Sequence, residues 1–117
     1  MKRQPSERLR HGSDLAPVAE FFQLLADPAR LGILVRLAKG ERNVSGLRDE
    51  LELPQPTVSH HLKLLRAAGL VARRRSGRFV LYRLEGRALT DPGGGSLRMS
   101  GEHCGIEIRL RTECGAP

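Results

Sequence analysis

The chain has 117 residues and a mass of 12.9 kDa, which allows one domain with a real core and excludes two comfortable ones. Aromatic residues make up only 3% and tryptophan is absent, so the core must be built from leucine, valine, isoleucine and alanine on helices. The net charge is +7, with an isoelectric point near 10.7, which indicates an anionic partner. We therefore expect a small, mostly helical fold.

The excess of positive charge lies in one segment. Between Pro54 and Arg83 there are seven cations and no carboxylate, so the rest of the chain holds 13 residues of each sign. A one-sign cluster on an otherwise neutral chain is typical of a surface that binds a polyanion, and nucleic acid is the first partner to consider. The seven cations are Lys63, Arg66, Arg73, Arg74, Arg75, Arg78 and Arg83.

Cysteine content and hydropathy indicate the compartment. Two cysteines give no disulfide framework, and the first residues contain no apolar run that would act as a signal sequence. No stretch approaches the roughly 18 to 20 apolar residues of a membrane span. We expect a soluble cytoplasmic protein with reduced thiols and without a cofactor, whose residues 1–12 form a flexible basic arm.

Three short helices are predicted before residue 52. The first follows Ser13 or Asp14 as its N-cap; the second starts at Asp27-Pro28 and stops at Lys39-Gly40. The third opens at Val44-Ser45 and runs to Leu51, with Ser45 as its expected cap. Apolar residues recur at helical spacing in the first helix at Leu15, Val18, Ala19, Phe22 and Leu25, with Phe21 widening the stripe.

A fourth helix is predicted between Pro56, which suits the first helical turn, and Gly69, which suits the left-handed position after the end. At about 100° per residue, one side is apolar and the other holds amide, hydroxyl and cationic groups, which suit phosphate oxygens and base edges. His61 falls on the apolar side and His60 next to the polar one, so we expect His61 to be structural. The apolar side comprises Val58, His61, Leu62, Leu64, Leu65 and Ala68, and the polar side Gln55, Ser59, Lys63 and Arg66.

A short helix, a turn and a second helix with a polar outward face form a helix-turn-helix, whose second helix, residues 55–68, enters the major groove. Two strands around a Ser76-Gly77 turn follow it and predict a β-hairpin wing with arginines at its tip. The fold class is thus mostly α with a wing, over residues 13–89. The expected DNA-binding residues are Gln55, Pro56, Thr57, Ser59, His60, Lys63, Arg66, Arg73, Arg74, Arg75 and Arg78.

The glycine-rich residues 90–96 have the composition of a flexible linker. Beyond them, residues 97–100 and 106–111 alternate apolar and polar, which predicts a second hairpin within residues 97–117. Because an isolated hairpin is marginal in water, its apolar side needs a surface to cover, and we expect that surface to be the first helix at a homodimer interface. A disordered tail is the alternative. The expected interface comprises Leu15, Val18, Phe22, Leu97, Met99, Ile106, Ile108 and Leu110.

Three stretches together resemble the ArsR/SmtB family of bacterial winged-helix repressors: residues 24–34, residues 53–65, and Ala68-Gly69-Leu70-Val71 with the wing. The resemblance covers residues 14 to 84. It implies a homodimer that binds a pseudo-palindromic operator and represses transcription until an effector weakens binding. In the family, polar residues of the recognition helix reach the bases, and here these match Gln55, Ser59 and His60.

The sequence also departs from this family. Residues 41–47 lack the thiols of the family's metal-sensing motif, and residues 85–90 replace the long final helix that carries the other metal site and the usual dimer contact. We expect the second hairpin to take the place of that helix. Metal sensing cannot be carried over, and His103, Cys104 and Cys114 are weak candidate ligands because they lack any recognised spacing.

Two other functions stay open. One is a winged helix that binds a protein, and the other is a thiol-redox-responsive repressor that uses Cys104 and Cys114. No acid–base pair, nucleophile constellation or phosphate loop is present, so we do not expect an enzyme. The sequence favours a DNA-binding regulator with double-stranded DNA and a second copy of itself as partners.

Overall fold

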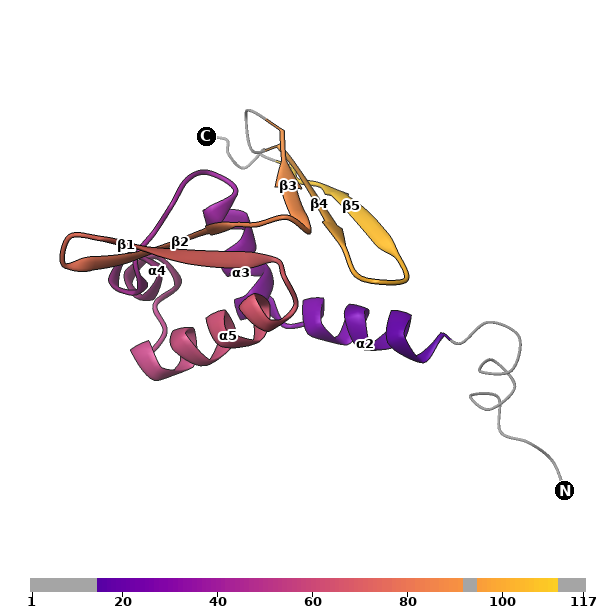
Figure 1. Cartoon of the computed structure of the whole chain (residues 1–117), viewed down its shortest axis with the longest axis horizontal. Coiled ribbons are helices and arrows are strands. Elements are labelled where there is room, and N and C mark those ends of the chain that lie inside the picture. The colour runs from indigo at the N-terminus through magenta and orange to yellow at the C-terminus, as the bar shows by residue number, and fades with distance from the viewer. Residues whose placement is uncertain (1–14, 92–94, 112–117) are drawn as a thin grey trace, which may run out of the picture.

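The computed structural model describes residues 15–91 and 95–111. Four helices, α2 (Ala16–Leu25), α3 (Pro28–Leu37), α4 (Val44–Leu51) and α5 (Gln55–Ala67), precede strands β1 (Val71–Ser76) and β2 (Phe79–Leu84), as Figure 1 shows. Three more strands follow, β3 (Ala88–Thr90), β4 (Ser96–Ser100) and β5 (Gly105–Arg109). This is the predicted winged helix-turn-helix with added C-terminal strands. The expected arm at residues 1–12, the caps Ser13 and Asp14, and Cys114 lie outside the described residues.

The helix starts follow from local capping chemistry. Asp27 caps α3 as predicted, because its Oδ1 accepts hydrogen bonds from the backbone N–H of Ala29 at 2.8 Å and of Arg30 at 3.4 Å. The expected cap of α4 was wrong: Asn43, not Ser45, lies at the N-cap position, and its Oδ1 accepts from the Gly46 N–H at 2.7 Å. Gly69 takes the left-handed conformation after α5, with φ of 79°, as predicted.

The wing is an antiparallel pair with one further short contact. The β1–β2 register runs from Val71↔Leu84 to Ser76↔Phe79, so the turn is Gly77-Arg78, one residue later than the sequence predicted. Arg42 forms an isolated bridge with Tyr82, with hydrogen bonds of 2.8 and 3.1 Å between their backbones. This bridge connects the loop before α4 to the wing.

The C-terminal strands form a three-stranded antiparallel sheet in the order β3-β4-β5, where the sequence predicted two strands. Thr90 belongs to β3 and Ser96 to β4, two paired strands of one sheet, whereas the sequence predicted a linker over residues 90–96. Asp91 Oδ1 accepts hydrogen bonds from the N–H groups of Gly95 at 2.6 Å and Ser96 at 3.3 Å. Leu97 lies opposite Ile108 and Met99 opposite Ile106 in the predicted pairing of the last two strands.

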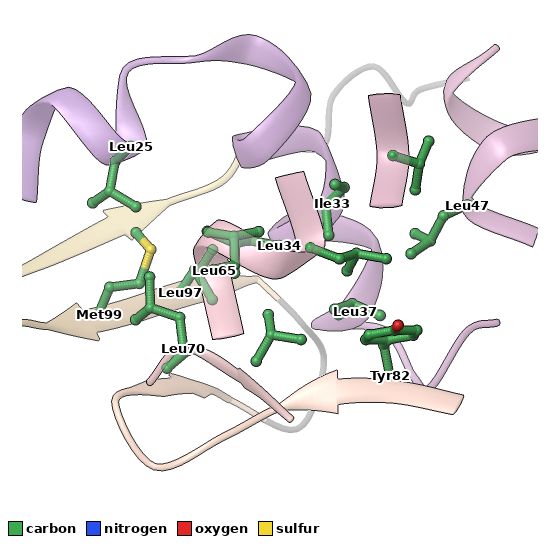
Figure 2. Packing of buried hydrophobic residues seen from close by; sticks show 14 of the residues in the cluster. Leu25, Ile33, Leu34, Leu37, Leu47, Leu65, Leu70, Tyr82, Leu97 and Met99 are labelled. Carbon is green, nitrogen blue, oxygen red and sulfur yellow. The ribbon is translucent and has the colours of Figure 1, made fainter. Parts of the chain in front are cut away.

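One hydrophobic core spans the helices, the wing and the C-terminal sheet. Ile33, Leu34, Leu47 and Leu65 are fully buried, and so are Leu97 and Met99 of β4. Figure 2 shows Leu97 and Met99 beside Leu70 from the start of the wing. The expectation that these two residues meet a second chain was wrong, because their side chains are already used inside the protomer.

In helix α2 the residues that face the core differ from those that the sequence predicted. Phe21 and Leu25 enter the core, whereas Leu15 and Phe22, which the apolar stripe placed together with Leu25, are 42% and 48% exposed. The helix thus contributes one edge of its stripe to the core. The other edge remains available to a partner.

Candidate nucleic-acid interface

Helix α5 separates into the two faces that its periodicity predicted. Val58, His61, Leu62 and Leu65 are buried against the core. The opposite face is open to solvent over nearly its whole length and carries no carboxylate. On it Gln55, Pro56, Ser59, His60 and Lys63 are exposed, and Thr57 and Arg66 are half-buried.

The inner histidine helps to fix the orientation of α5. Arg30 Nε donates a hydrogen bond to His61 Nδ1 at 3.2 Å, and Arg30 Nη1 donates to the carbonyl oxygen of Leu24 at 3.0 Å. Arg30 thus joins the end of α2, the start of α3 and helix α5.

The end of α5 and the start of the wing share one groove. Lys63 and Arg66 from α5 and Arg73 from β1 line a shallow, open groove of about 560 Å³, together with Ala67, Val71 and Ala72. Cations from a helix and from a strand thus line one surface groove. A phosphate backbone running across the end of α5 would meet all three.

Strand alternation divides the wing arginines between two faces. Arg73 and Arg75 share one face of β1, and Arg74 lies on the other. Arg74 is held by Glu41: Nε lies 3.0 Å from Oε2 and Nη2 lies 2.8 Å from Oε1. Among the described residues no carboxylate lies within ion-pair distance of Arg73, Arg75 or Arg78.

The ion pair between Arg74 and Glu41 also shifts the pKa values of both groups. The hydrogen bond from Arg74 is the largest influence on the Glu41 carboxyl and lowers its pKa below the ordinary value, and Glu41 in turn raises the pKa of Arg74. Sequence reasoning missed Glu41 because the loop that carries it lies 33 residues from Arg74 along the chain. The Arg42–Tyr82 bridge holds this loop against β2.

Of the weak candidate ligands at the C-terminus, the structure describes His103 and Cys104. His103 is exposed, with Nε2 at 3.8 Å from Glu102 Oε1, and Cys104 is half-buried in the turn between β4 and β5. Within the described part of the chain, no three side chains of the metal-ligating types come together. Nor does any described helix have the length and apolar character that crossing a membrane requires.

Known proteins resemble this chain over the same region. The model of the bacterial regulatory protein arsR family matches residues 27–73. An uncharacterized HTH-type transcriptional regulator of Methanocaldococcus jannaschii is 48% identical over 65 residues, which cover 55% of this chain and 73% of that protein. The chain belongs to the ArsR family. The HTH-type transcriptional repressor SmtB of Mycobacterium tuberculosis is 50% identical to this family member over 70 residues, or 60% of the chain.

Solved structures of related sequence share the fold. Reduced HlyU from Vibrio cholerae has a TM-score of 0.58 and 33% identity, over 67% of this chain and 82% of that one. The homodimeric winged helix-turn-helix DNA-binding domain of a possible ArsR-family regulator from Mycobacterium bovis has a TM-score of 0.56 and 36% identity, over 74% and 77%. The chain spans about half the length of the SmtB protein that it matches, 52%.

Proposed function

We propose that this ArsR-family protein is a homodimeric transcriptional repressor that binds a pseudo-palindromic DNA operator. One observation carries the proposal: the exposed face of α5 has no carboxylate and continues, through the groove lined by Lys63, Arg66 and Arg73, into the wing. Polar groups that suit base edges thus lie beside cations that suit phosphates. SmtB of Mycobacterium tuberculosis, half identical over the matched region, is a transcriptional repressor, which supports the same role here.

The contacts divide into two kinds. Gln55, Ser59 and His60 on the outer face of α5 read bases in the major groove, with Pro56 and Thr57 beside them at the first turn of the helix. Lys63, Arg66, Arg73, Arg75 and Arg78 bind phosphates along the same path. Arg74 makes a weaker contribution than its neighbours, because Glu41 already pairs with its guanidinium.

Homodimerisation rests on two supports. The related domain from Mycobacterium bovis is described as homodimeric. In this chain the exposed Leu15, at the N-cap of α2, and Phe22 within α2 leave apolar surface uncovered, with the half-buried Val18 on the same helix. Two copies related by a twofold axis present two recognition helices to two half-sites, which is what a palindromic operator requires.

A salt titration tests the DNA-binding proposal. The upstream region of the protein's own gene serves as the specific duplex, and an unrelated duplex of equal length as the competitor. If a dimer neutralises roughly 8 phosphates, log K falls against log salt with a slope of about −7. A slope near zero, or equal affinity for both duplexes at every salt concentration, contradicts the proposal and favours a protein-binding winged helix.

A further inference from the structure

Strand β5 is the free edge of the C-terminal sheet. It pairs with β4 on one side, and no strand of the described residues pairs with it on the other. Two flanking hydrogen bonds fix which backbone groups are already used: Leu110 N–H donates to Gly95 at 2.8 Å, and Gly101 N–H donates to Cys104 at 2.7 Å. The even-numbered residues of β5 therefore face β4, and Gly105, Glu107 and Arg109 direct their backbone N–H and C=O groups outward.

The side chains of this edge also separate by face. Ile106 and Ile108 pack against the protomer's core, whereas Glu107 and Arg109 are exposed on the outer face of the sheet. Glu107 lies opposite Arg98 of β4, with Oε1 at 4.0 Å from its Nε. The edge thus carries one charge of each sign, two residues apart, on either side of Ile108.

We infer that β5 joins two protomers by pairing antiparallel with β5 of a second copy of this chain, with the twofold axis at Ile108. This inference rests on the proposed homodimer and names its interface. In this register Glu107 lies opposite the partner's Arg109, and Arg109 opposite the partner's Glu107. Both are hydrogen-bonded pairs, because the outward-facing backbone groups belong to the same residues.

Twofold registers centred on a charged residue of β5 oppose like charges at the axis. An axis at Glu107 places two carboxylates opposite each other, and an axis at Arg109 does the same with two guanidinium groups. Like charges directly opposite are destabilising, whereas opposite charges stabilise a cross-strand pair. The register at Ile108 also keeps the apolar residues on one face, with Ile106 opposite the partner's Leu110.

The arrangement is compatible with DNA binding. A twofold axis perpendicular to the joined sheet leaves both cores on the same side of it. In Figure 1 β5 is the strand of the C-terminal sheet farthest from the wing, and α5 approaches this sheet at its C-terminal end, where Ala67 lines a pocket with residues of the β4–β5 turn. Pairing through β5 therefore uses no residue of the outer face of α5. An exposed edge strand that pairs with its own symmetry mate also no longer offers its backbone to other chains.

Charge reversal tests the register. Glu107→Arg gives an edge with two cations, and Arg109→Glu gives one with two carboxylates, so each variant alone opposes like charges at both pairs. We expect the self-association constant of each, measured by sedimentation equilibrium without DNA, to fall by about tenfold or more. Mixed in equal amounts, the two variants restore both attractive pairs, and we expect heterodimers as tight as the wild-type dimer.

The control is Glu102→Arg, which makes the same charge change in the exposed turn outside the pairing; we expect wild-type association. The inference is wrong if each edge variant dimerises like the wild type, if mixing restores nothing, or if the wild type is a monomer. A thermal melt of each variant shows that it is folded before its association is interpreted.

Disulfide trapping provides a second measurement. In a chain with Cys104→Ser and Cys114→Ser, Ile108→Cys places two thiols at a non-hydrogen-bonded pair across the axis, with Cα atoms about 4.5 Å apart, within the range for a disulfide. Ile106→Cys is the control, because its symmetry mate lies four residues further along the strand, about 13 Å away. We expect covalent dimers from Ile108→Cys only.

These outcomes separate the interface from the DNA-binding proposal. If Ile108→Cys gives covalent dimers but the protein does not bind DNA, the proposed repressor function is wrong and the proposed β5 interface is supported. Specific DNA binding by a dimer that yields no trapped product would refute the edge pairing alone, and equal trapping by both cysteine variants would do the same.

Discussion

A single carboxylate divides the arginines of the wing into two kinds. Glu41 holds Arg74 through both of its oxygens, while Arg73 and Arg75 on the other face of β1 have no carboxylate partner among the described residues. Glu41 therefore limits how many wing cations are free to bind phosphate. Its neighbour Arg42 anchors the same loop to Tyr82, so the pair is positioned by backbone pairing.

Replacing Glu41→Gln should release Arg74 and strengthen binding to DNA of any sequence. We expect the slope of log K against log salt to become steeper by about one for each protomer, because one more phosphate contact is gained. Asp49→Asn, which makes the same charge change at an exposed position on α4, is the control. An equal gain in both variants would show that net charge, and not Arg74, is responsible.

The same pair predicts a pH dependence of stability. Because the hydrogen bond from Arg74 lowers the pKa of Glu41 below its ordinary value in the folded state, its carboxylate contributes stability that is present above that ordinary value and is lost as pH falls through the lower folded value. Urea unfolding of the wild type and of Glu41→Gln should therefore differ most near neutral pH and converge in acid. A constant difference between pH 7 and pH 3 would contradict this linkage.

Adjacent histidines on α5 have different surroundings and should respond differently to mutation. His61→Ala removes a buried ring and leaves Arg30 Nε without its acceptor, so we expect a loss of about 1–3 kcal/mol in the free energy of unfolding. His60→Ala changes an exposed ring, and surface changes of this kind stay within about 0.5 kcal/mol. Denaturant unfolding of both variants checks the difference.

At the scale of elements, local patterns predicted most of the winged helix. The 100° periodicity of residues 55–68 placed Val58, His61 and Leu65 inward correctly, and Asp27-Pro28 marked the start of α3. The pattern failed where the signal is short or tertiary. Strand β3 has three residues and no periodicity to detect, and Phe21 and Phe22 exchange roles because only the packed neighbours decide which ring is inside.

Substitutions in the wing and in α5 should impair DNA binding in different ways. Arg75→Ala and Arg78→Ala should weaken binding to specific and unrelated duplexes about equally, because phosphate contacts carry no sequence information. Gln55→Ala and His60→Ala should instead reduce discrimination, by about 1–3 kcal/mol for a good base contact. Equal losses on both duplexes in all four variants would show that the reading face of α5 is wrongly assigned.

At the scale of the whole molecule, the C-terminal strands are part of the core and not an appendage. The alternation of residues 97–100 predicted a strand correctly, but its apolar side was expected against a second chain, because an isolated hairpin offers no other partner. The sequence alone could not show that Ala88 and Met99 lie opposite each other and seal the same core as Leu34. The placement of β4 against this core depends on the path of the chain after β2.

Leu97→Ala and Met99→Ala should each destabilise the protein by about 2–5 kcal/mol, since each truncates a fully buried side chain. Leu89→Ala, on the same sheet but more than half exposed, is the matched control and should cost far less. Thermal and denaturant unfolding measure the difference. Losses as small as that of the control would mean that the C-terminal sheet folds independently of the helices.

The burial of β4 has a consequence for how the protein is made. Leu97 and Met99, which close the core, leave the ribosome after every helix that the structure describes. A nascent chain that has emerged only as far as the wing has helices α2 to α5 but leaves Leu34, Leu65 and Leu70 without their final covering. Folding therefore completes after translation of the DNA-binding elements has ended. A ribosome stalled just beyond the wing would display a partly folded chain with exposed apolar surface, which chaperones would bind.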